Sequence, residues 1–290
     1  MGSTCYWLGE FTDARIHLER GLALYDPAYS NRYAAMTPDD PACTTRIYFS
    51  RSLLSLGHLE RAQVERNRAL MESRPHAHTL GFVLAHSCLG ERNSSTELLS
   101  RAEEAIVIGM ERGFPVWSAS GSMFKGWCLA TSGRPAEGID LLHQGLAVWR
   151  AIGAMMDLPV YLMLLADAHS KAREPEEGLD QLDEAARIIN VTQARWADAE
   201  IQRVRGNLLI ATGQREAAER SFAQALTVAR NQNAKLWELR AAMSMARFWR
   251  DQGKRDEARE LLAPIYGWFT EGFDTLDLKE AKALLEELAA

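Results

Sequence analysis

The chain has 290 residues, of which 47% are hydrophobic and 25% charged, as in an ordinary soluble globular protein. Its net charge of -6 disfavours a generic nucleic-acid binder, which would carry a basic excess. The N-terminus lacks the pattern of a signal peptide, and no apolar run is as long as a transmembrane helix. Four scattered cysteines without a CxxC pair indicate free thiols in a reducing cytosol. We therefore expect a cytoplasmic protein that contacts neither nucleic acid nor membrane.

Residues 1–25 hold an incomplete first repeat. Cys5, Trp7 and Leu8 form the tail of a helix whose upstream part is missing, so we expect an incomplete N-terminal helix pair or a fragment of a longer protein. Residues 26–41 are rich in Pro, Asp and Tyr, and they predict an irregular insertion that distorts the regular stacking.

Six further copies of the same spacing occupy residues 42–269. In each copy a turn residue is followed by a small residue five positions later, mostly a bulky apolar residue nine later and a small residue twelve later. Gly213, for example, leads to Ala218, Phe222 and Ala225. In chain order the turn residues of all seven copies are Gly9, Gly57, Gly90, Gly133, Arg173, Gly213 and Gly253.

The turn position favours glycine because it requires a positive backbone φ angle, which a residue with a Cβ atom resists. Arg173 departs from this pattern, so we expect a turn that is either strained or rebuilt around Pro175. A small residue also stands seven positions before most turn residues, for example Gly126 before Gly133, where two helices would approach closely. Breaker-rich segments, including residues 91–95, predict loops.

This spacing resembles the tetratricopeptide repeat, with helices longer by roughly half a turn to a turn than the standard repeat. The resemblance implies an all-α, right-handed superhelix of about seven long helix pairs. We expect thirteen or fourteen helices and no strands.

The segment PIYGWFTEGFDT, from Pro264 to Thr275, ends the last repeat. We expect its aromatic side chains to pack between the last repeat helix and a capping helix, with Gly272 in the turn and Glu271 as a turn or cap residue. Residues 270–290 then form the turn and the capping helix. Asp277 and Glu280 match a capping box at the start of this helix.

The last third of the chain, from AKLWELRAAMSMARFWRDQG to KALLEEL, resembles the C-terminal end of a bacterial multidomain family. Those proteins join an adenylate/guanylate cyclase domain or a winged-helix domain to an AAA-type ATPase and a long tetratricopeptide solenoid. The resemblance implies a sensor or regulatory arm in signal transduction, with upstream ATPase or cyclase domains as partners. It implies no catalytic residue in this chain.

The motifs of common catalytic sites are missing from the sequence, which has no GxxxxGK[ST], GxSxG or HExxH. His76, His78 and His86 could coordinate a metal, but the first two are only two positions apart after a proline, which disfavours a shared helical face. Cys88, two residues after His86, lies in an apolar run typical of a core thiol. We therefore expect no enzyme, cofactor or metal site.

The concave surface offers a candidate binding site, because the first helix of each pair lines the inside of such a superhelix. Counting back from the turn residues by 13, 10, 6 and 3 gives the inward positions. The candidates are Trp127, Met163, Asp167, Glu200, Arg203, Asn207, Arg240, Arg247 and Arg250.

Arginine's planar fork suits carboxylates, so one hypothesis is a peptide or protein partner, acidic in character, bound in the groove. The arginines could instead pair with their own neighbours, as Arg203 can with Glu200 three residues earlier. An alternative is a small-molecule sensor with an apolar pocket around Met123, Trp127, Tyr161 and Met163. A closed apolar pocket would favour a metabolite, whereas an open polar channel would favour a peptide. The ligand and the oligomeric state stay open.

Overall fold

The computed structural model describes residues 1–290 apart from 30–31, 34–35 and 91–95. The described residues form fifteen α-helices and one 3-10 helix, without a β-strand. The α-helices are α1 (Gly2–Leu8), α2 (Phe11–Leu24), α4 (Pro41–Ser55), α5 (Leu59–Ser73), α6 (Ala77–Cys88), α7 (Thr96–Arg112), α8 (Pro115–Thr131), α9 (Pro135–Ala151), α10 (Leu158–Ala172), α11 (Pro175–Thr192), α12 (Asp198–Ala211), α13 (Arg215–Asn231), α14 (Lys235–Arg250), α15 (Arg255–Tyr266) and α16 (Leu276–Ala289).

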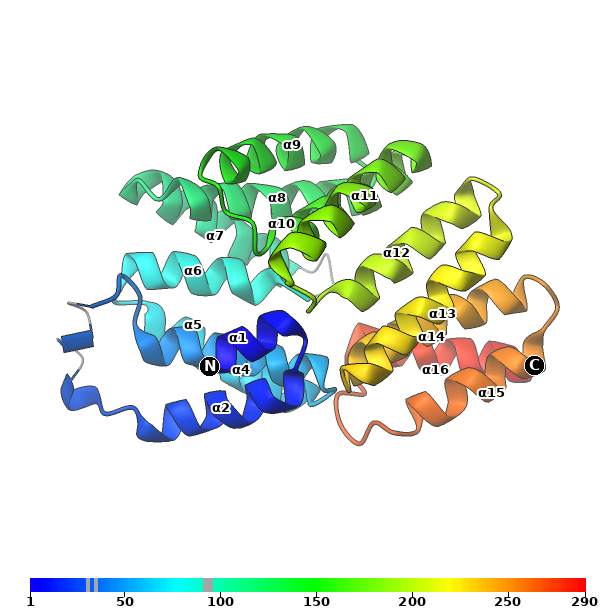
Figure 1. Cartoon of the computed structure of the whole chain (residues 1–290), viewed down its shortest axis with the longest axis horizontal. Helices are drawn as coiled ribbons and strands as arrows, with labels where there is room; N and C mark the ends of the chain where they lie inside the picture. The colour runs from blue at the N-terminus through cyan, green and yellow to red at the C-terminus, as the bar shows by residue number, and fades with distance from the viewer. Residues whose placement is uncertain (30–31, 34–35, 91–95) are drawn as a thin grey trace.

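Seven antiparallel helix pairs, from α1 with α2 to α14 with α15, stack side by side into a superhelix, and α16 follows the last pair (Figure 1). The all-α tetratricopeptide-type solenoid with seven pairs and a final helix is therefore confirmed. The count of fifteen α-helices exceeds the expected thirteen or fourteen, because α1 is a helix in its own right.

All seven turn residues adopt the left-handed conformation that the spacing predicts. Arg173 is the only one with a side chain, and its φ of 65° and ψ of 36° lie in the same region as those of the glycines. Its amide N–H caps the end of α10 by donating to the carbonyls of His169 and Ser170. The turn is thus strained rather than rebuilt, since a residue with a Cβ costs on the order of 1 kcal/mol in this conformation.

The small residues on either side of a turn allow two helices to touch, as at α8 and α9. A Cβ atom added to Gly138 would lie 2.3 Å from the carbonyl oxygen of Gly126, and one added to Gly126 would lie 2.6 Å from that of Gly138. Both distances are far below van der Waals contact, so only glycine fits at these two positions.

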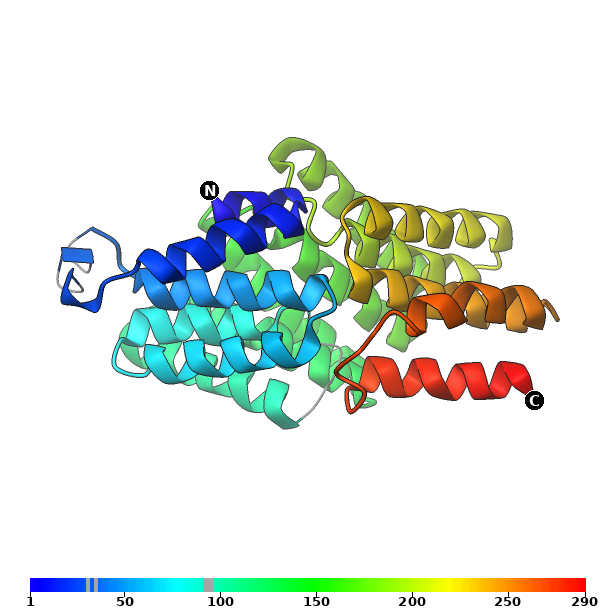
Figure 2. The ribbon, with the colours of Figure 1, turned by 90° about the horizontal axis from the view of Figure 1, so that it is seen from below.

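The two ends of the superhelix meet. The backbone N–H of Arg195, before α12, donates to the carbonyl of Trp7 in α1 at 2.7 Å. The guanidinium of Arg240 in α14 donates to the carbonyl of Gly90 after α6 at 3.1 Å. Figures 1 and 2 show the segment between α15 and α16 beside α4 and α5 in both views. One turn of the superhelix therefore closes on itself.

The segment from Pro264 to Thr275 contributes to this closure, whereas its aromatic side chains were expected to pack between α15 and α16. The rings of Trp268 and Phe269 lie against Gly57, in the turn between α4 and α5. The Phe269 side chain is buried, whereas that of Trp268 is exposed. Phe273 is exposed, while Gly272 makes the predicted turn with a φ of 76°.

Glu271 caps a helix that is 211 residues away in sequence. The amide N–H of Glu60, in the first turn of α5, donates to Glu271 Oε1 at 3.1 Å. In return the N–H of Gly272 donates to Glu60 Oε1 at 3.0 Å. This exchange resembles a capping box whose two halves come from opposite ends of the chain, and it satisfies an N–H that has no intrahelical acceptor.

The predicted capping box at Asp277 and Glu280 is wrong. Helix α16 begins at Leu276, and its N-cap, Thr275, makes no side-chain cap. Asp277 lies inside the first turn, where its carboxylate binds Arg240, while Glu280 binds Arg247.

Parts of two sequence predictions lie outside the described residues. In the insertion 26–41 the structure describes a 3-10 helix, Pro27–Tyr29, but not residues 30–31 and 34–35. The loop 91–95, with the predicted small residue Ser95, also lies outside. Within the described parts of the chain, no helix combines the length and apolar character needed to cross a membrane.

Candidate functional site

A pocket, here called the central pocket, lies on the inner side of the closed superhelix. Its lining comes mainly from α8, α10, α12 and α14. Its cavity volume is about 50 Å³, and the cavity opens to solvent. Its lining residues are Cys88, Leu89, Gly90, Phe124, Trp127, Val160, Met163, Leu164, Asp167, Trp196, Ala197, Glu200, Arg203, Val204, Trp237 and Arg240.

The structure brings most of the predicted site residues together. Six of the nine line the central pocket: Trp127, Met163, Asp167, Glu200, Arg203 and Arg240. The other three lie farther along the same inner helix faces, outside the pocket. Asn207 is exposed, and Arg247 and Arg250 face α16.

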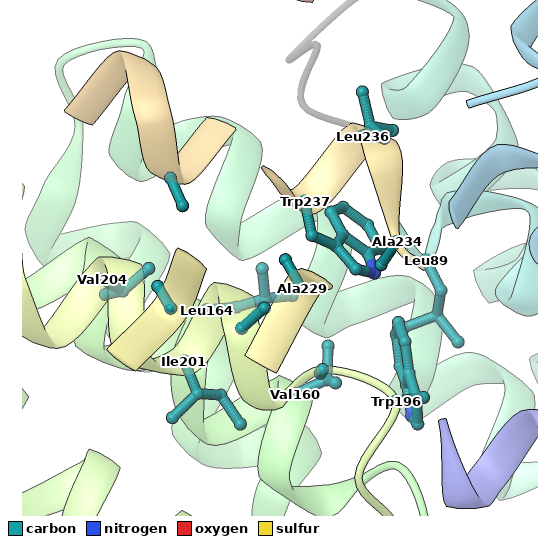
Figure 3. Close-up of a cluster of buried hydrophobic side chains, with 14 of the residues drawn as sticks. Leu89, Val160, Leu164, Trp196, Ile201, Val204, Ala229, Ala234, Leu236 and Trp237 are labelled. Atoms are coloured by element: carbon teal, nitrogen blue, oxygen red, sulfur yellow. The ribbon is translucent and has the colours of Figure 1, made fainter. Parts of the chain in front are cut away.

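The walls of the central pocket are largely apolar. Trp127, Trp196 and Trp237 are all buried, and Met163 is half-buried. Figure 3 shows Trp196 and Trp237 reaching into the same space beside Leu89. The apolar pocket of the small-molecule alternative thus exists around Trp127 and Met163.

Two residues expected in that apolar pocket are core residues instead. Met123 is 0% and Tyr161 1% exposed, and neither lines the pocket. The side chain of Met123 packs against Gly145 of α9.

One wall carries two arginines that are already paired. Arg203 donates to both oxygens of Glu200, at 2.9 and 3.1 Å. Arg240 donates to both oxygens of Asp277, each at 2.8 Å, and lies 3.5 Å from Glu200. Burial lowers the pKa of Arg240, but Asp277 and Glu200 more than offset this, so its pKa lies above the usual value. Both guanidiniums are therefore charged and neutralised within the chain.

Helix α16 extends the same neutralisation along α14. Glu280 Oε2 accepts from Arg247 at 3.0 Å, and both carboxylate oxygens of Glu287 lie within 3.2 Å of Arg250. Arg250 also binds its neighbour Asp251 at 2.9 Å. Carboxylates of the chain itself thus occupy the arginine row that suggested an acidic ligand.

Asp167 differs from the other charged groups of the central pocket. Its Oδ2 accepts from Trp127 Nε1 at 2.8 Å, which fixes both side chains against the pocket. The ammonium of Lys171 lies 3.9 Å from its Oδ1, beyond hydrogen-bond distance, and the guanidinium of Arg203 is close enough to interact with Asp167 electrostatically. About a quarter of the Asp167 side chain is exposed, so this oxygen can accept a hydrogen bond from a ligand.

Sequence reasoning missed Trp196 and Trp237, two of the largest apolar surfaces of the pocket. Trp196 comes from the loop before α12, outside the repeat spacing. Trp237 lies on α14, 16 positions before the turn residue Gly253 and one helical turn before the first inward position that was counted. Extending the backward count by one turn would have found Trp237, whereas no periodic signal marks Trp196.

The candidate histidines have neighbours of other kinds. His78 Nδ1 lies 2.8 Å from Asp39 Oδ1, and His86 Nδ1 lies 2.9 Å from the carbonyl of Phe82. Burial lowers the pKa of His86 to about 3. No group of three or more His, Cys, Asp or Glu side chains in the described ranges is placed to hold a metal ion. Cys88 is buried at the pocket wall, as expected of an apolar run.

Comparison with known proteins places the chain among solenoids. No family model matches the sequence. An uncharacterized protein, R02095, of Rhizobium meliloti (strain 1021) is 26% identical over 253 residues, which cover 83% of this chain and 24% of the relative. The chain therefore spans about a quarter of the length of this relative.

Two solved structures have a similar fold. The apo form of RapI matches 99% of this chain and 96% of its own, with a TM-score of 0.56 and 14% identity. A Rap protein complexed with Competence and Sporulation Factor matches 84% of this chain and 74% of its own, with a TM-score of 0.54 and 11% identity. At these identities the likeness extends to the fold alone.

Proposed function

We propose that the chain is a non-catalytic recognition module, which binds a peptide or protein segment in the central pocket and acts as the regulatory arm of a longer signalling protein. The observation that carries the proposal is the central pocket itself, where three buried tryptophans and a half-buried methionine surround a small set of fixed polar groups. Apolar walls with a few placed polar groups are the usual composition of a ligand site.

Two comparisons support this proposal. The similar Rap protein was solved in complex with Competence and Sporulation Factor, so a solenoid of this fold can hold a partner. The curated relative is about four times as long as the matched region, as a regulatory arm would require. Cyclase, winged-helix or ATPase domains upstream are the partners that the sequence resemblance implies.

Occupancy of the pocket could reach other domains through the closure of the superhelix. Arg240 contacts the pocket, α16 and Gly90 at once, so a ligand that shifts Arg240 also acts on the junction between the two ends. The regulatory step in this proposal is a change in the closure between α4–α5 and α14–α16.

A small molecule is the second candidate occupant. The surface of the pocket is more apolar than polar, which is the property expected of a metabolite site rather than a polar peptide channel. A short peptide side chain and a metabolite of similar size would use the same walls.

The test is a binding screen with a positional-scanning hexapeptide library, read by the fluorescence of the pocket tryptophans. Met163→Trp should fill the pocket and weaken binding at least about tenfold, a loss of about 1.4 kcal/mol. The matched control Asn207→Trp adds the same side chain at an exposed inner position outside the pocket and should bind like the wild type. Absence of any binding peptide, or equal loss in both variants, would contradict the proposal.

A further inference from the structure

We propose that the central pocket selects a ligand with a positively charged hydrogen-bond donor, an ammonium or guanidinium group carried on an apolar body. This inference deepens the proposed function and rests on it. It reverses the sequence expectation of an acidic ligand, because the charges that face the pocket leave an acceptor rather than a cation available.

The arginines of the pocket offer little to an anion. Arg203 uses its Nε and one terminal nitrogen on Glu200, and Arg240 uses the same two atoms on Asp277. Asp277 was outside the predicted site, and it adds a third carboxylate to the two that line the pocket.

Asp167 is the carboxylate with remaining capacity. An ionised carboxylate has about four lone-pair sites, and the only hydrogen bond to Asp167 in the described structure comes from Trp127. Arg203, which donates to Glu200, also attracts Asp167 electrostatically. Lys171 lies on the next turn of α10 with a half-exposed side chain. Lys171 approaches Asp167 Oδ1 without forming a hydrogen bond, so a ligand cation can compete with it.

The surrounding rings favour the same class of ligand. Trp127 presents its ring beside the carboxylate that its own indole N–H orients, and Trp196 and Trp237 form further walls (Figure 3). Aromatic faces attract cations, and the attraction grows in a site from which water is excluded. Met163 and Val160 then contact the alkyl part of the ligand.

A peptide with a basic side chain or a free N-terminus supplies an ammonium or guanidinium group on an apolar body.

The experiment compares three apolar pentapeptides that differ only in the central residue, which is lysine, norleucine or glutamate. The corresponding small-molecule arm uses hexylammonium, hexanol and hexanoate. We expect the lysine peptide to bind about ten- to a hundredfold more tightly than the norleucine peptide, as a charge-assisted hydrogen bond allows, and the glutamate peptide to bind most weakly. Tighter binding of the lysine peptide than of hexylammonium would identify a peptide as the source of the cation.

Two variants with opposite expected effects test the role of Asp167. Asp167→Asn keeps an oxygen that can accept from Trp127, but it should remove most of the preference for lysine over norleucine. Lys171→Gln removes the competing cation and should strengthen binding of the lysine peptide several-fold. A general loss of structure would not produce changes in opposite directions.

The outcomes separate the inference from the proposed function. Equal binding of the three peptides, abolished by Met163→Trp, would overturn the charge selection and leave the recognition site standing. Preference for glutamate, or a lysine preference that survives Asp167→Asn, would also overturn it. Library peptides that bind without any basic group, while the lysine probes do not, would contradict this inference alone.

Discussion

Arg51 on α4 and Arg240 on α14 come from opposite ends of the superhelix and are both 3% exposed, yet their guanidiniums have different surroundings. Arg240 makes two 2.8 Å hydrogen bonds to Asp277 and lies 4.9 Å from the ring centre of Trp237. Hydrogen bonds of fixed geometry hold this arginine, and through it they join α14, α16 and the Gly90 carbonyl.

Arg51 lies in an aromatic cage instead. Its guanidinium carbon is 4.5 Å from the ring centre of Tyr6 and 4.6 Å from that of Trp196, with Tyr48 and Trp7 slightly farther away. Its nitrogens form no hydrogen bond within the described part of the chain. The nearest carboxylate, Asp157, is 3.9 Å away. The cage also joins distant segments, but through ring faces rather than directed bonds.

The difference shows that the two ends meet through two kinds of contact. The C-terminal contact depends on a matched ion pair, so it should fail when one partner is removed. The N-terminal contact depends on cation–π attraction and packing, which are distributed over several rings, and on the hydrogen bond from the Arg195 N–H to the Trp7 carbonyl. The following variants test this contrast.

Asp277→Asn should cost about 3 kcal/mol of unfolding free energy, because it leaves Arg240 buried without its bidentate partner. The estimate lies at the low end for a broken buried pair, since Glu200 stays 3.5 Å from Arg240. Urea denaturation measures the change. Asp274→Asn, at an exposed position three residues earlier, is the control. Equal stability of the two variants would show that the pair does not hold the C-terminal contact.

Asp157→Asn should have the opposite sign at neutral pH. Burial raises the pKa of Asp157 from 3.8 to about 6, and Arg51 only partly offsets this. A carboxyl whose pKa is higher in the folded protein binds more protons there, so its contribution to stability falls as pH rises from about 4 to about 6. Asparagine removes this loss, and we expect the variant to gain on the order of 2 kcal/mol at pH 7.

The measurement for Asp157 is urea unfolding of wild type and variant at pH 4 and pH 7. The advantage of the variant should be small at pH 4 and largest at pH 7. His86 Nε2 lies 3.5 Å from Asp157 Oδ2, so the difference between the two proteins reports Asp157 together with its effect on His86. If Asp157→Asn instead destabilised the protein at pH 7 as much as Asp277→Asn does, Arg51 and Asp157 would form a stabilising ion pair. The difference between the surroundings of Arg51 and Arg240 would then not hold.

Glu271→Ala should cost about 1 kcal/mol, the usual effect of losing a helix cap. The lost cap is on α5, whose Glu60 N–H would then face solvent without an acceptor. Hydrogen exchange of the Glu60 amide should therefore accelerate. Glu260→Ala, an exposed change on α15, should alter neither quantity. Unchanged exchange at Glu60 would show that the cap does not persist in solution.

The sequence predicted the repeats well because the repeat is a local property. Each turn position, small residue and bulky residue depends on neighbours within about twelve positions, so the spacing specifies the helix pairs and the left-handed turns at the glycines, while at Arg173 it left a strained and a rebuilt turn open. Inward positions follow from the same period, which is why six of nine candidate residues line one pocket.

The closure of the superhelix could not be predicted in this way. Whether Glu271 reaches Glu60 depends on the small rotation that each helix pair adds to the next, summed over the whole chain. For the same reason, the partners of the arginines could not be predicted from the sequence. Asp277 matched a local capping pattern, whereas its actual partner, Arg240, lies 37 residues away on α14.

The most direct test of the account is the distance between the two ends in solution. Spin labels at Gln63→Cys on α5 and Asp274→Cys before α16 would lie on the two sides of the junction, and the four native cysteines are buried. The closed superhelix predicts one narrow distribution at short distance. A broad distribution at long distance, as in an open solenoid, would contradict the meeting of the ends and with it the central pocket.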